Sequence, residues 1–300
     1  MDVHPGIALT HALITGSRGQ DGRYLTDLLE AKGYTVVGVD RDDCDLCDAE
    51  AVEALLRDVA PREVYNLAAA TFVPASWDDP ASALSAGVVA GVLLSVIARA
   101  DRTIRFFQAS SAEVFGRAEV PQSERTPYRP GSPYAVGKAS ADQLVAAYRA
   151  HDGLHASSGI LFNHESPLRP THFLPAKVAH GVRAIASGRT NELVLGDLDA
   201  RRDWGWAPDY VRAMWLMLQQ DEPDDYVIAT GEAHTVRELV EIAFAHVGLD
   251  WRLHVRVDPE LVRGDERTLV GDATKARERL GWSPTVTFEQ LVHLLVDAAE

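Results

Sequence analysis

Three glycines near the N-terminus constrain the fold of this chain more than any other feature. Gly16, Gly19 and Gly22 follow an apolar run at residues 12–14 and precede a stretch with apolar residues at helical spacing. This order predicts a strand, a tight turn and a helix, in which a pyrophosphate can lie on the free N–H groups of the helix N-terminus. An ordinary glycine-rich turn is the alternative. The position of the glycines at the start of a βαβ unit favours a dinucleotide site.

The rest of the first half alternates between strand and helix patterns. Strands are predicted at residues 34–39, 63–68, 104–109 and 158–162, and helices at 49–59, 82–100 and 134–151. Such alternation is typical of an α/β fold, here a Rossmann-type doubly wound parallel sheet with helices on both faces. Polar clusters follow the strands at Gly16, Asp40, Asn66 and Ser110, where α/β sheets bind ligands.

The second half is less regular, because Pro167, Pro170 and Pro175 interrupt it. We predict helices at 177–186, 209–218, 236–247 and 288–298, strands at 226–229 and 254–257, and a loop at 196–208. The strand at 226–229 is expected to rejoin the first sheet. The expected domains are therefore a dinucleotide-binding domain, 1–163 plus about 225–231, and a smaller α/β substrate-binding domain in the remainder of 164–300.

Composition excludes several classes of protein. The 300 residues contain 29 Lys and Arg against 44 Asp and Glu, a net charge of −15, which argues against a nucleic-acid or anionic-membrane surface. We expect no membrane span and no secretory signal. The two cysteines, Cys44 and Cys47, lack the further ligands of a metal site and are interpreted as incidental thiols. These features indicate a cytoplasmic protein without a metal.

Tyr134 and Lys138 are four residues apart, so that both lie on one face of the predicted helix. An ammonium near a phenol lowers the pKa of the phenol, and the phenolate can then accept a hydroxyl proton near neutral pH. Oxidation of an alcohol by a nicotinamide requires such a base. A surface lysine beside a packed tyrosine is the alternative. The serines at 110 and 111, which end the preceding strand, favour the catalytic interpretation because a serine hydroxyl there can bind the substrate oxygen.

Glu113 lies two residues beyond Ser111. A glutamate in a loop is most often a solvated charge. Beside a Tyr/Lys pair it is a candidate second base, needed only by an enzyme that also removes a carbon-bound proton next to a new ketone.

The chain resembles the extended short-chain dehydrogenases/reductases, and within them the GDP-mannose 4,6-dehydratase family. The matching segments run nearly the whole length; they are residues 15–22, 45–48, 64–69, 108–113, 132–138, 159–167, 202–205 and 225–232. The segments at 163–167 (NHESP) and 202–205 (RDWG) are much more specific than the glycine turn.

The resemblance implies a redox-neutral dehydration by a hydro-lyase with a tightly bound nicotinamide cofactor. Tyr134 would deprotonate the sugar C4 hydroxyl as hydride leaves C4, Glu113 would remove the C5 proton, water would leave from C6, and the hydride would return to C6. Lys138 would tune Tyr134 and hold the ribose, and Ser111 would stand where the family has threonine.

The same resemblance implies contacts for the ligands. The expected cofactor residues are Gly16, Ser17, Arg18, Gly19, Gln20, Asp21, Gly22, Asp40, Arg41, Asp45, Leu46, Leu67, Ala68, Ala69, Thr71, Tyr134, Lys138, His164 and Arg169. The expected substrate residues are Ser111, Glu113, Asn163, Lys177, Arg202 and Arg263. For Arg202 and Arg263, a surface charge is an equally good interpretation.

Several positions depart from the family pattern. The loop after the second predicted strand is short, and Asp40 at the strand end would repel a 2′-phosphate and could bind a free ribose diol. Arg18 and Arg41 would favour the phosphate. We expect NAD, with NADP possible, and no tetramer. On the substrate side, Asp197 stands where the family has asparagine, and the segment after Arg263 differs.

Alternatives therefore remain. The substrate could be a different nucleotide sugar or a nucleoside; the enzyme could be a reductase of a 4-keto-6-deoxy sugar nucleotide; or the chain could bind a dinucleotide without catalysis. In related enzymes the helices that correspond to 82–100 and 134–151 pair into a four-helix dimer interface. The resemblance thus implies a homodimer, although both helices could simply cover the sheet.

Overall fold

The computed structural model describes residues 10–261 and 268–300, which form two compact units. Unit 1 comprises residues up to Ser110, Ser132–Gly159 and Met214–Asp225, and unit 2 comprises Ser111–Gly131, Ile160–Ala213 and the residues from Tyr226 onward. The expected domains have other boundaries: they assign residues 111–131, 160–163 and 226–231 to the dinucleotide-binding part and residues 214–224 to the substrate-binding part.

Unit 1 is built on parallel strands. The strands are β1 (His11–Thr15), β2 (Thr35–Val39), β3 (Glu63–Asn66), β4 (Arg105–Ala109) and β5 (Ala156–Leu161), of which β5 ends in unit 2. The pairs β1–β2, β1–β3, β3–β4 and β4–β5 are all parallel. With β10 (Tyr226–Ile228) they give a six-stranded sheet in the order β10-β5-β4-β3-β1-β2. The predicted parallel α/β sheet is confirmed, including the strand at 226–229.

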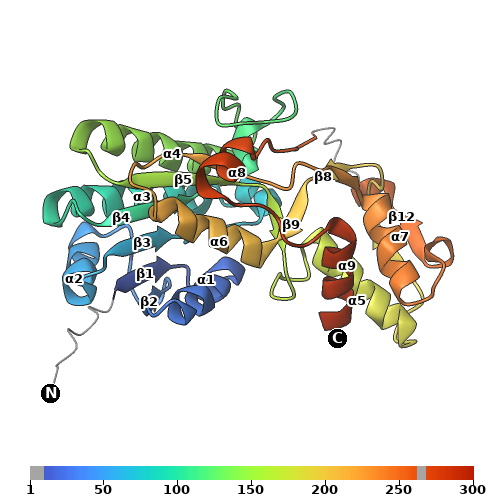
Figure 1. Ribbon diagram of the computed structural model, residues 1–300. Coiled ribbons are helices and arrows are strands. Elements are labelled where there is room, and N and C mark those ends of the chain that lie inside the picture. Colours follow the sequence, from blue (N-terminus) through green and yellow to red (C-terminus); the bar gives the residue numbers. More distant parts are fainter. Residues whose placement is uncertain (1–9, 262–267) are drawn as a thin grey trace, which may run out of the picture. The chain divides into compact units, whose positions relative to one another are not determined.

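Helices cover the sheet of unit 1 on both faces (Figure 1). They are α1 (Gln20–Ala31), α2 (Ala49–Val59), α3 (Pro80–Ala100), α4 (Pro133–Asp152) and the end of α6 (Ala207–Leu218), with a 3-10 turn η1 (Val73–Trp77). One core joins the strands to α2, α3 and α4, with Val52, Leu93 and Val145 fully buried. On α1, Leu25 and Leu29 are buried outside that core. The spacing of these apolar residues is what assigns each helix to a face.

Helix α3 is apolar enough and long enough, by composition and length, to cross a membrane. Half of its most apolar window is buried in the structure, and Ala90, Leu93 and Leu94 are fully buried. Such burial is that of a core helix, which passes the same test.

Unit 2 combines short strands with helices. Its strands are β6 (Asn163–Glu165), β7 (Leu193–Leu195), β8 (Arg201–Arg202), β9 (Trp204–Trp206), β10, β11 (His234–Thr235) and β12 (Val255–Val257). Its helices are α5 (Leu174–Ala186), the start of α6, α7 (Val236–His246), α8 (Thr274–Leu280) and α9 (Phe288–Ala298), with 3-10 turns η2 (Ala112–Phe115), η3 (Trp251–Leu253) and η4 (Pro259–Leu261).

Apart from β10, the strands of unit 2 pair in twos: β6 with β9, β7 with β12 and β8 with β11. Helices α5, α7 and α9 share one apolar core with Leu195 and Trp204 from the strands. The prediction of a loop at 196–208 was wrong, because β8, β9 and the start of α6 lie there. Strands of two or three residues are too short to show periodicity, so that only their pairing reveals them.

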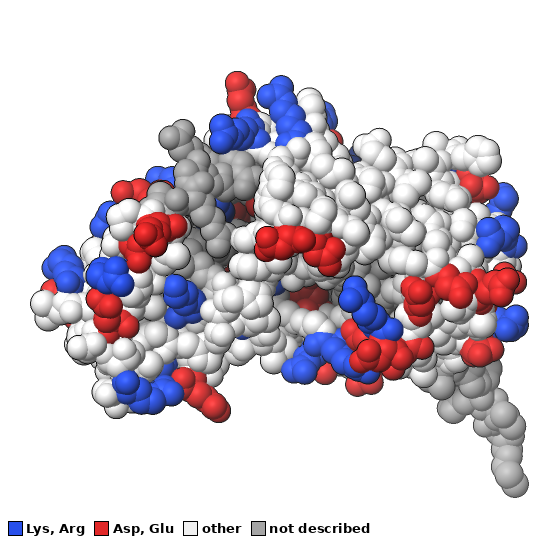
Figure 2. Space-filling view, turned by 180° about the vertical axis from the view of Figure 1, so that it is seen from behind, with Lys and Arg blue, Asp and Glu red and all other residues white. Residues whose placement is uncertain are grey.

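Charged side chains of both signs are interspersed on the face drawn in Figure 2. Among the described residues, no stretch of this face carries basic residues alone.

Candidate active site

The glycine turn after β1 has the geometry of a cradle. The backbone N–H of Gly16 donates to Val39 O, 2.8 Å away, and the φ of Gly16 is +73°, which favours glycine. A Cβ on Gly16 would lie 2.9 Å from the backbone N of Ala68, and one on Gly22 would lie 2.5 Å from Ser17 O. Gly19 caps α1 without a side-chain bond. The N-terminus of α1 and a backbone that side chains do not cover suit a pyrophosphate, so this turn fits a dinucleotide.

Asp40 follows β2 and organises the neighbouring polar groups. Its carboxylate accepts hydrogen bonds from Ser17 Oγ at 2.7 Å and from the backbone N–H of Arg18 at 3.2 Å. The guanidinium of Arg18 lies 3.5 Å from Asp40, 3.4 Å from Asp42 and 3.3 Å from Asp43. The positive charge of Arg18 is therefore shared among three carboxylates.

The other predicted cofactor residues of unit 1 lie in the segments that follow β2 and β3 or at the start of α1. Gln20 and Asp21 begin α1, with Gln20 Nε2 donating to Asp21 at 3.1 Å. Asp45 accepts the backbone N–H of Cys47 at 2.9 Å, and Leu46 is buried. Residues 67–71 follow β3, where Leu67 donates to Thr15 O at 3.1 Å; Ala68, Ala69 and Thr71 belong to this segment, and Arg41 is exposed after β2.

A buried polar ladder links the ends of β1, β3 and β4. Thr15 Oγ1 donates to Asn66 Oδ1 at 2.7 Å, and Asn66 Nδ2 donates to Gln108 Oε1 at 2.8 Å. Gln108 Nε2 donates to Ala109 O at 2.9 Å. Each buried amide is thereby satisfied. The sequence placed Asn66 among the polar clusters at the strand ends, but Thr15 and Gln108 were not singled out, although a polar residue closing each apolar strand was a usable signal.

Helix α4 carries the Tyr134–Lys138 pair. Its N-cap, Ser132, accepts the N–H of Ala135 at 3.2 Å, and Pro133 follows at the first helical position. Both Tyr134 and Lys138 are buried, and the ammonium lies 5.9 Å from the centre of the Tyr134 ring. Lys138 Nζ donates to Ala109 O at 2.8 Å. Burial lowers the pKa of Lys138 from 10.5 to about 8, opposed by the charges of Asp142 and Asp21.

Ser110, the residue after β4, is also buried, and its hydroxyl donates to the carboxylate of Asp142 on α4. The proposed role of a serine hydroxyl at this strand end therefore falls to Ser111, since Ser110 is bonded within unit 1. Asp142 was not among the predicted residues. Its position, four residues after Lys138, was the available signal.

Ser111 and Glu113 begin unit 2. Ser111 is the N-cap of η2, and its Oγ accepts the backbone N–H of Glu113 at 3.3 Å. This bond holds the two predicted side chains in one turn directly after β4.

Strand β6 and the loop after it contain three further predicted residues. Asn163 begins the strand. His164 is buried, with Nδ1 2.7 Å from Phe162 O and its ring stacked on Tyr210 at 4.5 Å. Arg169 lies 3.4 Å from the buried Glu165 and over the ring of Phe173. His164 and Arg169 thus belong to unit 2, whereas the other predicted cofactor residues belong to unit 1.

The predicted nucleotide-sugar residues that the structure describes lie on different elements of unit 2. Lys177 on α5 donates from Nζ to Val194 O at 2.8 Å. Arg202 is in β8 and donates from Nη1 to Arg201 O at 2.8 Å. Arg263 lies outside the described residues.

Asp203, within the RDWG segment, is a buried anchor. It accepts hydrogen bonds from Thr230 N and Oγ1 at 2.9 and 2.6 Å, from Gly231 N at 2.9 Å and from Gly271 N at 3.2 Å. Burial raises the pKa of Asp203, and these hydrogen bonds oppose the rise. Asp203 therefore joins the RDWG segment to the segments around Thr230 and Gly271 within unit 2.

Cys44 and Cys47 are free thiols, and burial followed by the charge of Asp45 raises the pKa of both. Neither is favoured as a thiolate nucleophile. Within residues 10–261 and 268–300, no three His, Cys, Asp or Glu side chains are grouped as metal ligands.

Solved structures of the same architecture define the class. A structure titled RMD from Pseudomonas aeruginosa, complexed with NADPH, matches with a TM-score of 0.87 and 25% identity, covering 96% of this chain and 98% of that one. UDP-glucose 4-epimerase from Thermus thermophilus, complexed with NAD, matches with a TM-score of 0.84 and 27% identity, covering 96% and 98%. The glycine turn, the parallel sheet and the Tyr134–Lys138 pair are those of an extended short-chain dehydrogenase/reductase.

Sequence comparison identifies the family within this class. The profile of the GDP-mannose 4,6 dehydratase family matches residues 42–295. GDP-mannose 4,6 dehydratase 1 of Arabidopsis thaliana is 43% identical over 95% of this chain and 88% of its own length. The human GDP-mannose 4,6 dehydratase is 40% identical over 96% and 90%, and the Vibrio cholerae enzyme 38% over 93% and 91%. This chain belongs to the GDP-mannose 4,6-dehydratase family, a family of hydro-lyases, and the predicted resemblance is confirmed.

Proposed function

We propose that this chain converts GDP-mannose into a 4-keto-6-deoxy sugar nucleotide, with loss of one water and no net redox change. The observation that carries the proposal is the buried ammonium of Lys138, one helical turn after Tyr134 and in the same unit as the glycine turn. Membership of the family, at 38–43% identity to the relatives above, supports the choice of substrate. The nicotinamide of a dinucleotide held by the glycine turn would accept a hydride from the sugar and return it within one turnover.

Tyr134 is the proposed base for the sugar C4 hydroxyl. An ammonium close to a phenol stabilises the phenolate, and the low dielectric of a buried site strengthens that effect. Lys138 is proposed to supply this charge and to hold the cofactor ribose. Its hydrogen bond to Ala109 O leaves two further N–H groups on the ammonium for such contacts.

Ser111 and Glu113 are proposed to complete the reaction. The hydroxyl of Ser111 would bind the C4 oxygen, and Glu113 would remove the C5 proton that the new 4-ketone acidifies, after which water leaves from C6. Their support is chain connectivity, since Ser111 directly follows Ser110, whose side chain is bonded to α4. The η2 turn sets the spacing of the two side chains.

The nucleotide-sugar side is proposed to involve Asn163, Lys177, Arg202 and Arg263, with His164 and Arg169 at the far end of the cofactor. Cationic side chains suit a diphosphate because charge-assisted hydrogen bonds to phosphate oxygens are strong. The departures around Asp197 and Arg263 make a different nucleotide sugar or a nucleoside the second candidate. Solved relatives bind such ligands, as in the UDP-glucose complex of an epimerase that is 26% identical.

NAD is proposed as the preferred dinucleotide, with NADP as the alternative. A carboxylate at the end of the second strand accepts the ribose hydroxyls of NAD and repels a 2′-phosphate. Asp40 occupies that position, Arg18 is shared among Asp40, Asp42 and Asp43, and Arg41 is exposed next to Asp40 in the sequence. Three carboxylates and two guanidinium groups leave an excess of negative charge there.

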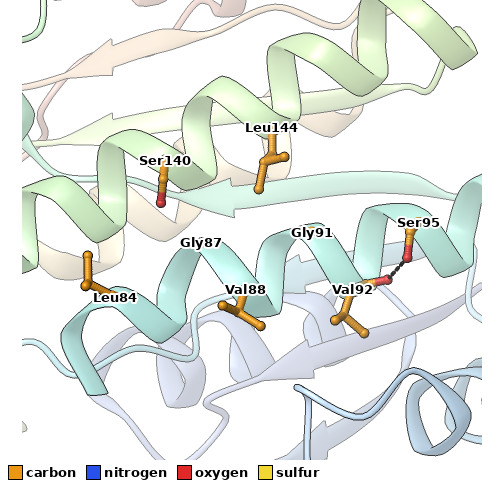
Figure 3. A pocket seen from close by; sticks show the side chains of 8 residues that line it. All are labelled: Leu84, Gly87, Val88, Gly91, Val92, Ser95, Ser140 and Leu144. Carbon is orange, nitrogen blue, oxygen red and sulfur yellow. Dashed lines mark hydrogen bonds between the residues drawn. The ribbon is translucent and has the colours of Figure 1, made fainter. Parts of the chain in front are cut away.

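A homodimer is proposed through helices α3 and α4. Figure 3 shows the groove between them, with Leu84, Val88 and Val92 from α3 and Leu144 from α4 along it. Its volume is about 470 Å³, and Leu84 and Val88 are exposed. Small residues at positions 87, 91 and 140 let the two helices approach closely beneath the groove, since a Cβ on Gly87 would collide with Ser140 Oγ. An exposed apolar strip of this kind is suited to helices of a second copy.

The cytoplasm is the proposed compartment. The chain carries free thiols at Cys44 and Cys47 and belongs to a family of water-soluble enzymes. Reduced cysteines are the norm in that compartment.

Mass spectrometry of the products from a panel of sugar nucleotides and nucleosides tests the proposal. We expect GDP-mannose to lose one water, with catalytic amounts of dinucleotide sufficient for many turnovers. Loss of water from another member of the panel, and not from GDP-mannose, would replace the substrate while keeping the reaction.

The same assay separates the remaining alternatives. A reductase of a 4-keto-6-deoxy sugar nucleotide consumes one reduced nicotinamide per product, and a non-catalytic protein binds the dinucleotide without any product. Either result would overturn the proposed dehydration.

A further inference from the structure

One stripe of helix α4 carries a third buried polar residue that the proposed mechanism does not use. Asp142 lies four residues after Lys138 and eight after Tyr134, so that the three side chains share one helical face. Tyr134 is 8% exposed, and Lys138 and Asp142 are each 4% exposed. A carboxylate so deeply buried requires a compensating charge and hydrogen bonds, because desolvation otherwise disfavours its charged form.

The end of β4 contacts both charged side chains of this stripe. Lys138 Nζ donates to Ala109 O at 2.8 Å, and the hydroxyl of the next residue, Ser110, donates to the carboxylate of Asp142. Ser110 is itself held by its backbone N–H, which donates to Gly159 O at 2.8 Å. The ammonium and the carboxylate are thereby held against the last residue of β4 and the residue that follows it, all within unit 1.

Within the described part of the chain, polar and charged groups from three elements act on Lys138. On its own helix Tyr134 and Asp142 face it, from α1 comes the charge of Asp21, and from β4 comes the carbonyl of Ala109. Burial lowers the pKa of Lys138 to about 8. The negative charges of Asp142 and Asp21 oppose this fall, and Asp142 has the larger effect. Without that charge, the ammonium would release its proton closer to neutral pH.

We propose that Asp142 is a positioning residue for the Tyr134–Lys138 pair. Its carboxylate keeps Lys138 in the charged form, and the hydrogen bond from Ser110 holds this carboxylate at the end of β4, next to the carbonyl that binds Lys138. The assignment rests on the proposed function only for the role of Tyr134 as the base. The protonation of Lys138 is a property of the folded chain whatever its substrate.

The test measures the titration of Lys138 directly. The chain contains four lysines, at positions 32, 138, 177 and 275, so that NMR of protein with labelled lysine side chains resolves each one, and Lys138→Arg assigns the signal. In Asp142→Asn, which keeps a hydrogen-bond acceptor for Ser110, the titration midpoint of Lys138 should fall by about one pH unit. In Asp142→Glu, which keeps the charge, it should stay close to the wild-type value.

Ser110→Ala is the matched control, because it removes the hydrogen bond and keeps the carboxylate; the midpoint of Lys138 should change by much less than in Asp142→Asn. Asp142→Asn could fail to fold. The double variant Ser110→Ala/Asp142→Leu then removes the charge together with the Ser110 hydroxyl that bonds it, and the same fall is expected. An unchanged midpoint in the variants without the carboxylate would refute the proposal.

Activity provides a second, separate measurement. If the midpoint moves from about 8 to about 7, kcat of Asp142→Asn at pH 8 should be about fivefold below wild type, and close to wild type at pH 6, with KM little changed. A uniform fall of kcat across pH would indicate a merely structural role. Absence of dehydratase activity in the wild-type protein would refute the proposed function and leave the NMR result intact.

Discussion

The ammonium of Lys138 on α4 donates a hydrogen bond to the backbone carbonyl of Ala109 at the end of β4, 2.8 Å away. The same carbonyl accepts a hydrogen bond from Nε2 of Gln108. Gln108 is in turn hydrogen-bonded to Asn66, and Asn66 to Thr15. A continuous polar ladder thus runs from the strand before the glycine turn to the proposed catalytic lysine. It explains how a charged group is held in the interior of unit 1.

The burial of Lys138 predicts a pH-dependent stability. Its pKa is 10.5 ordinarily and about 8 in the folded protein, because desolvation disfavours the ammonium. Between these values the unfolded chain retains a proton that the folded protein has released, so this residue makes the free energy of unfolding rise with pH. Relative to Lys138→Met, the wild type should gain on the order of 2–3 kcal/mol between about pH 8 and pH 10.5 in denaturant titrations. A difference that is flat with pH would contradict the lowered pKa.

The close approach at Gly16 predicts a defect in cofactor binding. In Gly16→Ala the Cβ would meet the backbone of Ala68 at 2.9 Å, and the backbone must also keep a positive φ. We expect a loss of roughly 1–3 kcal/mol of stability and a fall of at least about tenfold in dinucleotide affinity, measured by calorimetry. Gly33→Ala is the control, since Gly33 also has a positive φ, of +87°, and nothing lies within 4 Å of its added Cβ. Equal dinucleotide affinities in the two variants would contradict the proposal that the turn at Gly16 binds the dinucleotide.

The carboxylate of Asp40 predicts cofactor preference. Asp40→Asn removes the charge that opposes a 2′-phosphate and keeps an acceptor for Ser17, so the ratio of NADP to NAD affinity should rise about tenfold. Equilibrium binding of the two dinucleotides measures this. Asp42→Asn, at an exposed position that also contacts Arg18, should change the ratio much less. A wild-type protein that prefers NADP would overturn the proposed preference.

Glu113 is predicted to separate oxidation from dehydration. In Glu113→Gln the C4 hydroxyl can still be oxidised, but no group removes the C5 proton, so dehydration should fall at least about a thousandfold. Reduced nicotinamide, followed by its absorbance, should accumulate on the enzyme after addition of substrate. Tyr134→Phe is the matched control and should show neither signal. Full dehydratase activity in Glu113→Gln would refute the mechanism.

Asp203 is predicted to act on stability. Asp203→Asn places an amide where four donors converge on the carboxylate, from Thr230, Gly231 and Gly271. The free energy of unfolding, measured with a chemical denaturant, should fall by roughly 2–4 kcal/mol. Asp199→Asn removes an exposed carboxylate that pairs with Arg237 and should cost about 0–1 kcal/mol. If Asp203→Asn unfolds like wild type and yet loses activity, the residue acts on substrate.

Helices and strands were predictable where they are long enough for several apolar residues to show a period. The helices at 49–59 and 288–298 were predicted with the bounds that α2 and α9 have, and the parallel sheet was inferred from alternation alone. Strands such as β8 and β9 were missed because two or three residues carry no period. Helix α8 was also missed: it has seven residues, too few for an amphipathic pattern to stand out.

Within the candidate site, the sequence by itself determined what depends on neighbouring residues. It placed glycines 16, 19 and 22 at a strand-to-helix turn, and it put Tyr134 and Lys138 on one helical face, because turn geometry and helical spacing are local. The tertiary structure alone decided which distant groups meet: Ser110 with Asp142, Asn66 with Gln108, and Lys138 with Ala109. These contacts depend on strand register and helix packing, which bring together residues 29 to 42 positions apart and exclude water around them. That exclusion lowers the pKa of Lys138, and no local pattern encodes it.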